Sequence, residues 1–215
     1  MKSKLTFSII IPTLNEEKYL PNLLKSIEKQ TYMNLEVFVV DGQSKDNTQK
    51  IVKSFQKKIK NLKLIKSSKR NVSFQRNLGA KRASGKYLLF IDADVAFEQN
   101  ILEKIYQYIK KNSPPLFDTH LKFRSAKTIY KILSCSSCLF FQITSRLKRN
   151  IAIGQFLGIK KSVFNQIGGY NERLALSEEH NLVKSARKLN YHFHLLNKGK
   201  VYASPRRIEK EGMIK

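Results

Sequence analysis

Short apolar, β-branched runs alternate with segments of helical periodicity along the N-terminal half of the chain. The runs predict strands at Phe7–Ile11, Leu35–Val40, Leu62–Ile65 and Tyr87–Ile91. The helical segments each show the i, i+3, i+4, i+7 or similar spacing of one buried face, in the sets Leu20, Leu23, Leu24 and Ile27, then Thr48, Ile51, Val52 and Phe55, then Ile101, Ile105, Tyr108 and Ile109. This alternation predicts an α/β fold with a mainly parallel sheet and helices on both of its faces. Pro21 lies inside the first helical segment, so we expect that helix to begin late or to kink.

The chain of 215 residues has the length of one compact domain, and 41% hydrophobic residues are enough to form a core. We treat residues 1–215 as a single domain with subregions 1–111, 112–150 and 151–215. In the last subregion we expect an apolar run ending at Ile159, a short helix before Gly168, a helix opening at Ser177 and a strand around Val201.

The middle subregion, residues 112–150, carries an apolar stretch flanked on both sides by lysines and arginines. Two interpretations stay open, a core-facing helix with a solvated basic rim and an interfacial helix resting on anionic lipid. Cys135 and Cys138 lie in this stretch and read as small buried residues of a reducing cytoplasm, although the spacing also occurs in redox pairs and half zinc sites.

Targeting features also bear on where the chain works. The N-terminus lacks the apolar centre of a signal peptide, and no run of about 18 apolar residues could cross a bilayer. We therefore expect the chain in the cytoplasm, either free or peripherally bound to the cytoplasmic face of the membrane.

The charge of the chain is strongly positive: 41 Lys and Arg against 16 Asp and Glu give a net charge of +25. Such a field attracts anions, so the candidate partners are nucleic acid, acidic lipid headgroups and phosphorylated small molecules. Zinc-finger, RNA-recognition and basic-zipper patterns are absent from the sequence, so we expect no specific nucleic-acid partner.

Polar residues follow three of the predicted strands, and in a parallel sheet those strand ends line one crevice. They are Pro12-Thr13-Leu14-Asn15-Glu16, Asp41-Gly42-Gln43-Ser44 and Asp92-Ala93-Asp94. Asp92 and Asp94 have the i, i+2 spacing that projects both carboxylates to one side of a strand. Two adjacent carboxylates repel unless a cation joins them, which predicts Mg²⁺ or Mn²⁺ over the alternative of two solvated aspartates.

Several other charged residues have both a functional and a structural interpretation. Asp41 could accept hydrogen bonds from a nucleobase or ribose, or cap the turn that follows it. Arg70 and Arg76 could contact phosphate, or be ordinary surface charges. Glu178 and Glu179 could supply a general base, or oppose the dipole at a helix N-terminus.

Taken together, these segments resemble the inverting family 2 glycosyltransferases of the GT-A fold over nearly the whole chain. Residues 8–17 of this chain, SIIIPTLNEE, resemble the opening strand and nucleotide loop of that family, and residues 39–48, VVDGQSKDNT, are similar to its second signature. A third spans Arg76-Asn77-Leu78-Gly79-Ala80 to Phe90-Ile91-Asp92-Ala93-Asp94, and an acceptor-side segment resembles Gly168-Gly169-Tyr170 followed by Ser177-Glu178-Glu179.

The resemblance implies roles for the matching residues. It places Pro12, Thr13 and Asn15 in a nucleotide loop, Glu16 and Asp41 on the nucleoside, Asp94 chiefly on the metal and Asp92 on ribose or metal. It makes Glu179 the base, with Glu178 as the alternative because relatives usually have Glu-Asp there. Arg206 or Arg207 would serve the diphosphate where relatives often have a histidine.

The expected function is a metal-dependent, inverting hexosyl transfer from a UDP- or GDP-linked sugar to a hydroxyl or phosphate acceptor. Residues 1–111 would bind the nucleotide-sugar and residues 151–215 the acceptor, a glycan or a polyprenyl-phosphate-type lipid. The alternatives are a relative that binds donor without turnover and, with less support, a basic nucleic-acid-binding protein.

Overall fold

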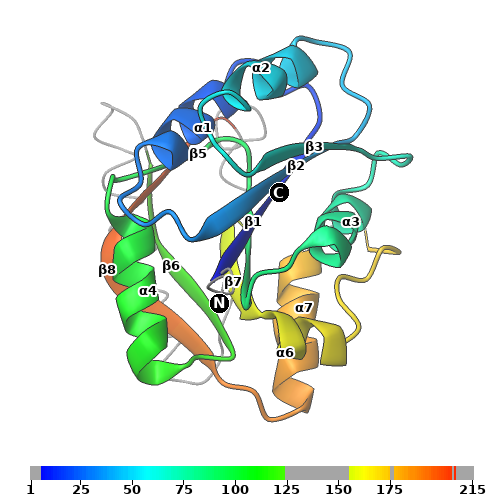
Figure 1. Cartoon of the computed structure of the whole chain (residues 1–215). Helices are drawn as coiled ribbons and strands as arrows, with labels where there is room; N and C mark the ends of the chain where they lie inside the picture. Colours follow the sequence, from blue (N-terminus) through cyan, green and yellow to red (C-terminus); the bar gives the residue numbers. More distant parts are fainter. Residues whose placement is uncertain (1–5, 124–154, 175–176, 205, 207–215) are drawn as a thin grey trace.

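A mixed sheet forms the centre of the molecule. The structure, a computed structural model, describes residues 6–123, 155–174, 177–204 and 206. Within them one 8-stranded sheet has the order β3-β2-β1-β4-β7-β6-β8-β5 (Figure 1). Its strands are β1 Phe7–Thr13, β2 Leu35–Asp41, β3 Leu62–Lys66, β4 Tyr87–Ile91, β5 Val95–Phe97, β6 Leu116–Phe123, β7 Phe156–Lys160 and β8 Phe193–Ala203. The β1–β2, β1–β4, β2–β3 and β6–β8 pairs are parallel, whereas β7 and β5 run antiparallel to their neighbours, so the expected mainly parallel sheet is confirmed.

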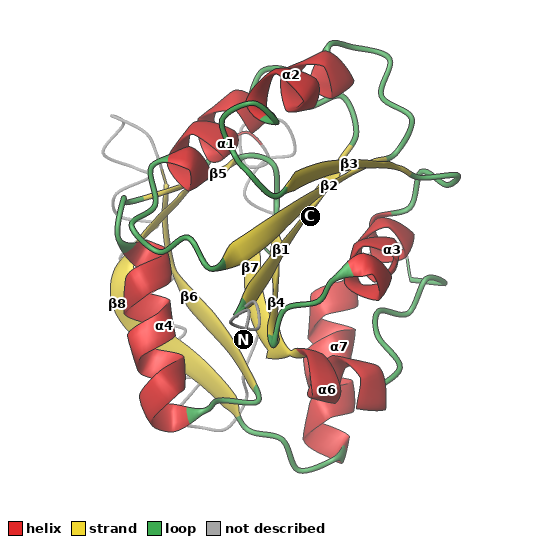
Figure 2. Ribbon diagram, in the orientation of Figure 1, coloured by secondary structure: helices red, strands yellow, loops and turns green. Residues whose placement is uncertain are grey.

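Helices cover both faces of this sheet, as the sequence predicts (Figure 2). They are α1 Leu20–Glu28, α2 Thr48–Phe55, α3 Val72–Arg82, α4 Ile101–Asn112, α6 Lys161–Gln166 and α7 Glu178–Lys188. Helices α1, α2 and α4 contribute to one apolar cluster, and α3, α6 and α7 contribute to the other. The two clusters lie on opposite faces because side chains alternate along the strands between them.

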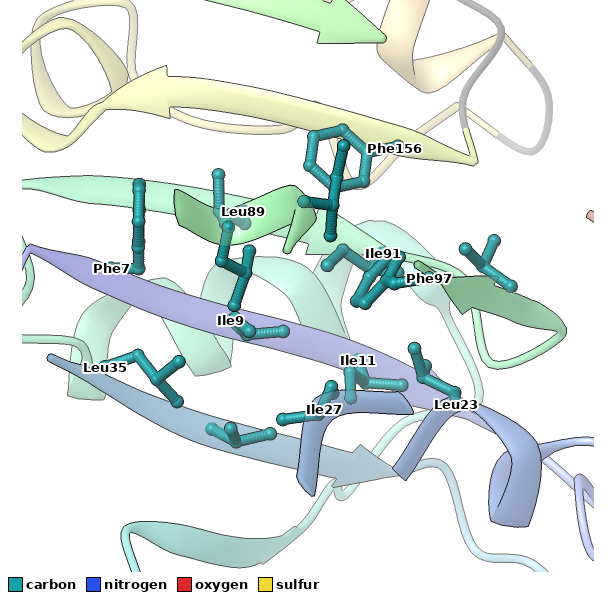
Figure 3. Close-up of a cluster of buried hydrophobic side chains, with 14 of the residues drawn as sticks. Phe7, Ile9, Ile11, Leu23, Ile27, Leu35, Leu89, Ile91, Phe97 and Phe156 are labelled. Atoms are coloured by element: carbon teal, nitrogen blue, oxygen red, sulfur yellow. The ribbon is translucent and has the colours of Figure 1, made fainter. Parts of the chain in front are cut away.

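Strand β1 shows this alternation directly. Phe7, Ile9 and Ile11 belong to the cluster under α1, whereas Ile10 belongs to the cluster under α3. In Figure 3 the side chains of Ile11 from β1 and Ile27 from α1 lie together in the first cluster. These residues are fully or almost fully buried. A strand that is covered on both faces has a continuous apolar sequence and not an alternation of apolar and polar residues.

The boundaries predicted from the sequence differ little from those observed. The strand Tyr87–Ile91 has the predicted bounds, while β1 and β2 continue to Thr13 and Asp41. Helix α1 begins at Leu20, so Pro21 lies in its first turn, where a missing N–H group costs little. Helix α7 opens directly after Ser177, as expected.

Helix α3, Val72–Arg82, is a helix that the periodicity did not predict, and the strands β5 and β6 were not predicted either. The buried positions of α3 include the polar residues Ser73, Gln75 and Arg76, together with Gly79 and Ala80. An apolar stripe is therefore missing, and the usual signal of an amphipathic helix is missing with it.

Most of the basic middle segment, including Cys135 and Cys138, lies outside the described residues. Strand β6 occupies the described part of subregion 112–150. Within the described ranges, no helix combines the length and the hydropathy that crossing a membrane requires.

Candidate active site

The polar loops after β1 and β2 hold each other in place. The amide N–H of Glu16 donates to the Thr48 hydroxyl over 2.8 Å, and that of Glu17 donates to Asp46 over 3.0 Å. In return, the N–H of Lys45 donates to the Asn15 side-chain oxygen over 2.8 Å. These bonds keep the two loops together at the carboxyl ends of neighbouring strands, where a ligand crevice is expected.

A cavity of about 410 Å³ opens beside these loops. Its walls come from the loop after β1, the N-terminal part of α3, the end of β4 and the C-terminal segment. Six predicted site residues line it, namely Pro12, Thr13, Glu16, Arg70, Asp92 and Arg206. Sequence reasoning did not name the other lining residues, Leu14, Asn71, Val72, Gln75, Ala93 and Leu174. Val72 and Gln75 lie on α3, a helix that was not predicted, and Asn71 caps it.

Arg206 forms the first of two charged clusters at this cavity. Its terminal nitrogens bind both carboxylate oxygens of Glu16 over 2.7 and 2.8 Å, and its Nε binds Asp94 Oδ2 over 2.8 Å. The guanidinium carbon lies 4.5 Å from the centre of the Tyr19 ring. Burial raises the pKa of Glu16 despite Arg206, and the two carboxylates raise the pKa of Arg206 although burial opposes them.

Asp94 itself faces a smaller cavity next to the first. This second cavity, of about 200 Å³, is also lined by Tyr19, Asn22 and Ser204. Arg206 bridges Glu16 of the larger cavity and Asp94 of the smaller one, so its side chain lies between the two.

Arg76 forms the second charged cluster. Its guanidinium binds Asp92 Oδ1 and Glu178 Oε1 over 2.9 Å each, and Glu179 Oε1 over 2.5 Å. Arg76 is only 1% exposed and does not line the cavity, which corrects the expectation that it contacts a phosphate there. It joins the donor-side carboxylate Asp92, which lines the cavity, to both candidate bases on α7.

The environment of Glu179 changes the affinity of its carboxylate for protons. The pKa of Glu179 is raised to about 7. Burial is the largest cause, Arg76 opposes it, and Glu178 and Asp92 add to the rise. A carboxylate with this pKa is a stronger proton acceptor than an exposed one, which suits a general base near neutral pH.

The acceptor-side turn is tied to α3 by asparagines whose roles the sequence did not reveal. Asn77 accepts a hydrogen bond from the Tyr170 N–H over 2.9 Å and donates to the Tyr170 carbonyl over 2.9 Å. Asn71 donates to the Glu172 carbonyl over 3.1 Å. The motif Arg76-Asn77 is the sequence signal that could have pointed to this contact.

Besides Arg76, Asp94, Glu178 and Glu179, two predicted site residues, Asp41 and Asn15, do not line the larger cavity. Asp41 is 1% exposed, and its carboxylate accepts hydrogen bonds from the Ser44 N–H and the Gln49 side chain, the capping role considered for it from the sequence. Asn15 is engaged in the contact between the two loops described above. Arg207 lies outside the described residues.

The carboxylates of this site have the chemistry that a divalent cation requires. Asp92, Asp94 and Glu16 offer the hard oxygen ligands that Mg²⁺ and Mn²⁺ prefer. One guanidinium is held by Glu16 and Asp94 together, so these side chains already converge on a position that stabilises positive charge. Among the described residues no group of three or more His, Cys, Asp or Glu could hold a metal, so a cation here would depend on ligand oxygens as well.

Comparison with known proteins agrees with this geometry. Residues 8–168 match the family described as Glycosyl transferase family 2. A dolichyl-linked diacetamido-glucuronosyltransferase of Methanococcus voltae is 39% identical over 116 residues, which are 51% of this chain and 36% of that protein. A PGL/p-HBAD biosynthesis glycosyltransferase of Mycobacterium bovis is 30% identical over 177 residues, 78% of this chain and 64% of that protein. The chain therefore spans only part of the length of these curated relatives.

Solved structures show the same architecture. Staphylococcus aureus TarS 1–349 in complex with UDP-GlcNAc has a TM-score of 0.76 and 25% identity, over 93% of this chain and 58% of that one. A mannosyltransferase of Pyrobaculum calidifontis, solved with GDP-Man and Mn²⁺, has a TM-score of 0.73 at 18% identity over 94% of this chain and 57% of that one, which supports the fold alone. With the family match over most of the chain and the GT-A architecture around the cavity, the chain belongs to glycosyl transferase family 2.

Proposed function

We propose that this chain transfers a sugar from a nucleotide-sugar donor to a hydroxyl or phosphate acceptor with inversion at the sugar carbon. The observation that carries the proposal is the ionic connection through Arg76 from Asp92, in the cavity wall, to Glu178 and Glu179 on α7. The same side chain thereby holds a carboxylate of the cavity wall and a candidate base, which suits a single-displacement reaction because it fixes their relative position.

The donor would occupy the cavity of about 410 Å³, with the nucleoside against Pro12 and Thr13 and the diphosphate toward Arg70 and Arg206. Arginine side chains suit this task because their planar donors match phosphate oxygens. The S. aureus neighbour binds UDP-GlcNAc and the Pyrobaculum neighbour GDP-Man, so a UDP- or GDP-linked sugar is the donor class that we propose.

Asp92 and Asp94 would hold Mg²⁺ or Mn²⁺, with Glu16 close by through the shared Arg206 contact. When bound, such a cation supplies positive charge that stabilises the departing nucleoside diphosphate. Arg206 would add a second positive charge to the same leaving group.

Glu179 would act as the general base that removes the proton from the attacking acceptor hydroxyl. Its burial and its raised pKa of about 7 favour this assignment, while Glu178 remains the alternative one position earlier. Arg76 would keep the carboxylate oriented toward the donor side, since it binds Asp92 at the same time. For an acceptor that attacks through an ionised phosphate, no proton needs to be removed, so that reaction would need no general base.

The acceptor class that we propose is a glycan or a polyprenyl-phosphate-type lipid, presented at the cytoplasmic face of the membrane. The M. voltae relative is named for a dolichyl phosphate-linked acceptor and TarS for poly(ribitol-phosphate), and both names contain a phosphate-bearing carrier. The net charge of +25 favours such anionic acceptors and a peripheral contact with anionic lipid.

A thermal-shift screen of UDP- and GDP-sugars with Mn²⁺ tests the donor, because a ligand that binds only the native state raises its unfolding temperature. We expect one nucleotide class to raise the unfolding temperature of the wild type. In Asp94→Ala we expect the Mn²⁺-dependent part of that rise to be lost. A wild type that no nucleotide-sugar stabilises would contradict the proposal. Stabilisation without hydrolysis or transfer would favour the alternative of a donor-binding relative that lacks turnover.

A further inference from the structure

Tyr170 lies beneath the Arg76 cluster and is held there from two sides. Its backbone N–H and carbonyl are both bound to the Asn77 side chain, at 2.9 Å each. Its ring packs edge-on against Phe90 with centroids 5.0 Å apart and contacts Phe164 at 5.9 Å. The guanidinium carbon of Arg76 lies 5.2 Å from the ring centre. The position of the ring is therefore fixed, and only its hydroxyl hydrogen is free to turn.

The Tyr170 hydroxyl is buried and has no hydrogen-bond partner among the described residues. The whole residue is 3% exposed, so bulk water does not solvate that oxygen. A buried hydroxyl without a partner lowers the stability of a protein, and phenylalanine would fill the same space without that cost. A buried hydroxyl without a partner calls for an explanation, and a role in catalysis is one that accounts for such groups.

The contacts around Tyr170 favour a carboxylate as the partner of its hydroxyl, because the guanidinium that lies over its ring binds three carboxylates. Burial raises the pKa of Tyr170 well above its usual value, with Glu179, Glu178 and Asp92 raising it further, so the phenol keeps its proton and can donate it in a hydrogen bond. Three carboxylates share the single guanidinium of Arg76. If all three are ionised, negative charge is in excess, and a neutral O–H donor would stabilise them without adding another charge.

We propose that Tyr170 is a positioning residue for the base, whose hydroxyl donates a hydrogen bond to the Glu178–Glu179 pair once a donor engages Asp92. Asp92 is the member of the cluster that lines the cavity, so a ligand that binds Asp92 would compete with its contact to Arg76. The remaining two carboxylates stay bound to Arg76, whose guanidinium carbon lies 5.2 Å from the centre of the Tyr170 ring. This inference rests on the proposed function, because it requires a donor in the cavity.

The test compares Tyr170→Phe with Tyr191→Phe, a matched loss of one hydroxyl at a distance from the cluster. The Tyr191 hydroxyl donates to the Gln166 side chain over 2.6 Å and contacts none of the charged residues described above. Unfolding temperatures are measured without ligand and with Mn²⁺ plus UDP-GlcNAc or GDP-mannose, whichever stabilises the wild type, and kcat is measured with the same donor.

For Tyr170→Phe we expect an unfolding temperature without ligand that is equal to or above that of the wild type, a smaller rise on adding donor, and a kcat lower by about tenfold. Tyr191→Phe should keep the wild-type rise and the wild-type kcat. If Tyr170 had only a structural role, its replacement would not lower kcat while the unfolding temperature without ligand stayed equal or rose.

Two results would overturn the inference while leaving the proposed function intact. One is a donor-induced rise and a kcat equal to those of the wild type, which would make the hydroxyl idle. The other is a lower unfolding temperature without ligand, which would show that the hydroxyl already has a partner, such as bound water, in the free protein. A wild type that no nucleotide-sugar stabilises would instead overturn the proposed function and this inference together.

Discussion

Arg206 and a divalent cation would require the same carboxylate oxygens, since the guanidinium binds both oxygens of Glu16 and one oxygen of Asp94. The donor-free protein must therefore release Arg206 before a cation can use these oxygens. A bound diphosphate offers Arg206 new partners, which would couple the binding of the cation to that of the nucleotide.

We accordingly expect Arg206→Gln to bind Mn²⁺ more tightly than the wild type in the absence of nucleotide, by on the order of tenfold. Electron paramagnetic resonance of free Mn²⁺ measures this affinity without any turnover. Arg82→Gln removes the same unit of charge from an exposed position at the end of α3 and should leave the affinity unchanged. Equal affinities in the wild type and Arg206→Gln would show that the arginine does not compete with the cation.

The pKa of Glu179, raised to about 7 mainly by burial, predicts the pH dependence of the reaction with an acceptor hydroxyl. The base acts in its ionised form, so kcat should rise as the pH increases through about 7. Glu179→Gln should lower kcat by about 100-fold or more while donor affinity is kept. If Glu178→Gln is the inactive variant and Glu179→Gln is active, the base is Glu178.

The same raised pKa has a consequence for stability with the opposite pH trend. The folded protein holds the Glu179 proton more tightly than the unfolded chain, whose value is near 4.5, so this stabilisation is present below pH 4.5 and is lost as the pH rises through about 7. Glu179→Gln should therefore unfold at a higher temperature than the wild type at pH 8, with a smaller difference at pH 5. Thermal unfolding at the two pH values measures this, and a lower unfolding temperature of the variant at pH 8 would contradict the cause given for the shift.

Helix α3 connects the cavity wall to α7 and to the turn at Tyr170. Arg76 and Asn77 are adjacent on it, the first bound to Asp92 and α7 and the second to the turn at Tyr170. The helix approaches the sheet closely at Gly79, where an added Cβ would lie 2.6 Å from Ile10 Cγ2. The position of α3 on the sheet therefore sets the position of the whole charged cluster.

Gly79→Ala tests this dependence. Helix propensity alone would make the variant more stable by about 1 kcal/mol, but the contact with Ile10 predicts a destabilisation of about 1–3 kcal/mol as α3 is displaced from β1. We also expect kcat to fall more than donor affinity, because the displaced helix carries Arg76. Denaturant unfolding and kinetics measure both effects, and a stabilised, fully active variant would show that α3 can move without disturbing the site.

The elements also differ in how well the sequence predicted them, for a physical reason. Strands β1, β2 and β4 are buried on both faces, so their apolar runs are visible in the sequence. Helix α3 buries the polar residues Gln75 and Arg76, so its buried face leaves no apolar pattern in the sequence. Their partners are polar groups far away in the sequence, which the local pattern cannot reveal. The acids of the site could be named because they follow predicted strands, whereas their pairing with Arg76 and Arg206 depends on distances across the fold.

The whole molecule is strongly basic, yet its candidate site is rich in acids. Lysines and arginines outnumber Asp and Glu by 41 to 16, while the two clusters described above place five carboxylates around Arg76 and Arg206. A positive surface increases the rate at which anionic donors and acceptors arrive, and the acids at the site then favour ligands that bring a cation with them. This division of charge argues against a nucleic-acid-binding protein, whose phosphate contacts would need the acids to be absent.

The same excess of positive charge predicts binding to anionic membrane surfaces. We expect the chain to sediment with phosphatidylcholine vesicles that contain phosphatidylglycerol, and to remain in solution with phosphatidylcholine alone. The binding should be lost at high salt, because the screening length falls from about 10 Å at 0.1 M to about 3 Å at 1 M. A chain that pellets with neither kind of vesicle would contradict the proposed membrane contact.

Two double lysine variants test whether the middle subregion or the overall surface charge is responsible for membrane binding. Lys127 and Lys131 flank the apolar stretch of the middle subregion, whereas Lys57 and Lys58 are exposed beyond the end of α2. Both double replacements by Gln remove the same charge, so an interfacial segment predicts that only the first weakens sedimentation strongly, since each basic residue near the surface contributes about 1 kcal/mol. Equal losses in the two variants would assign the binding to the overall charge, and the middle segment would then have no special part in reaching a lipid-linked acceptor.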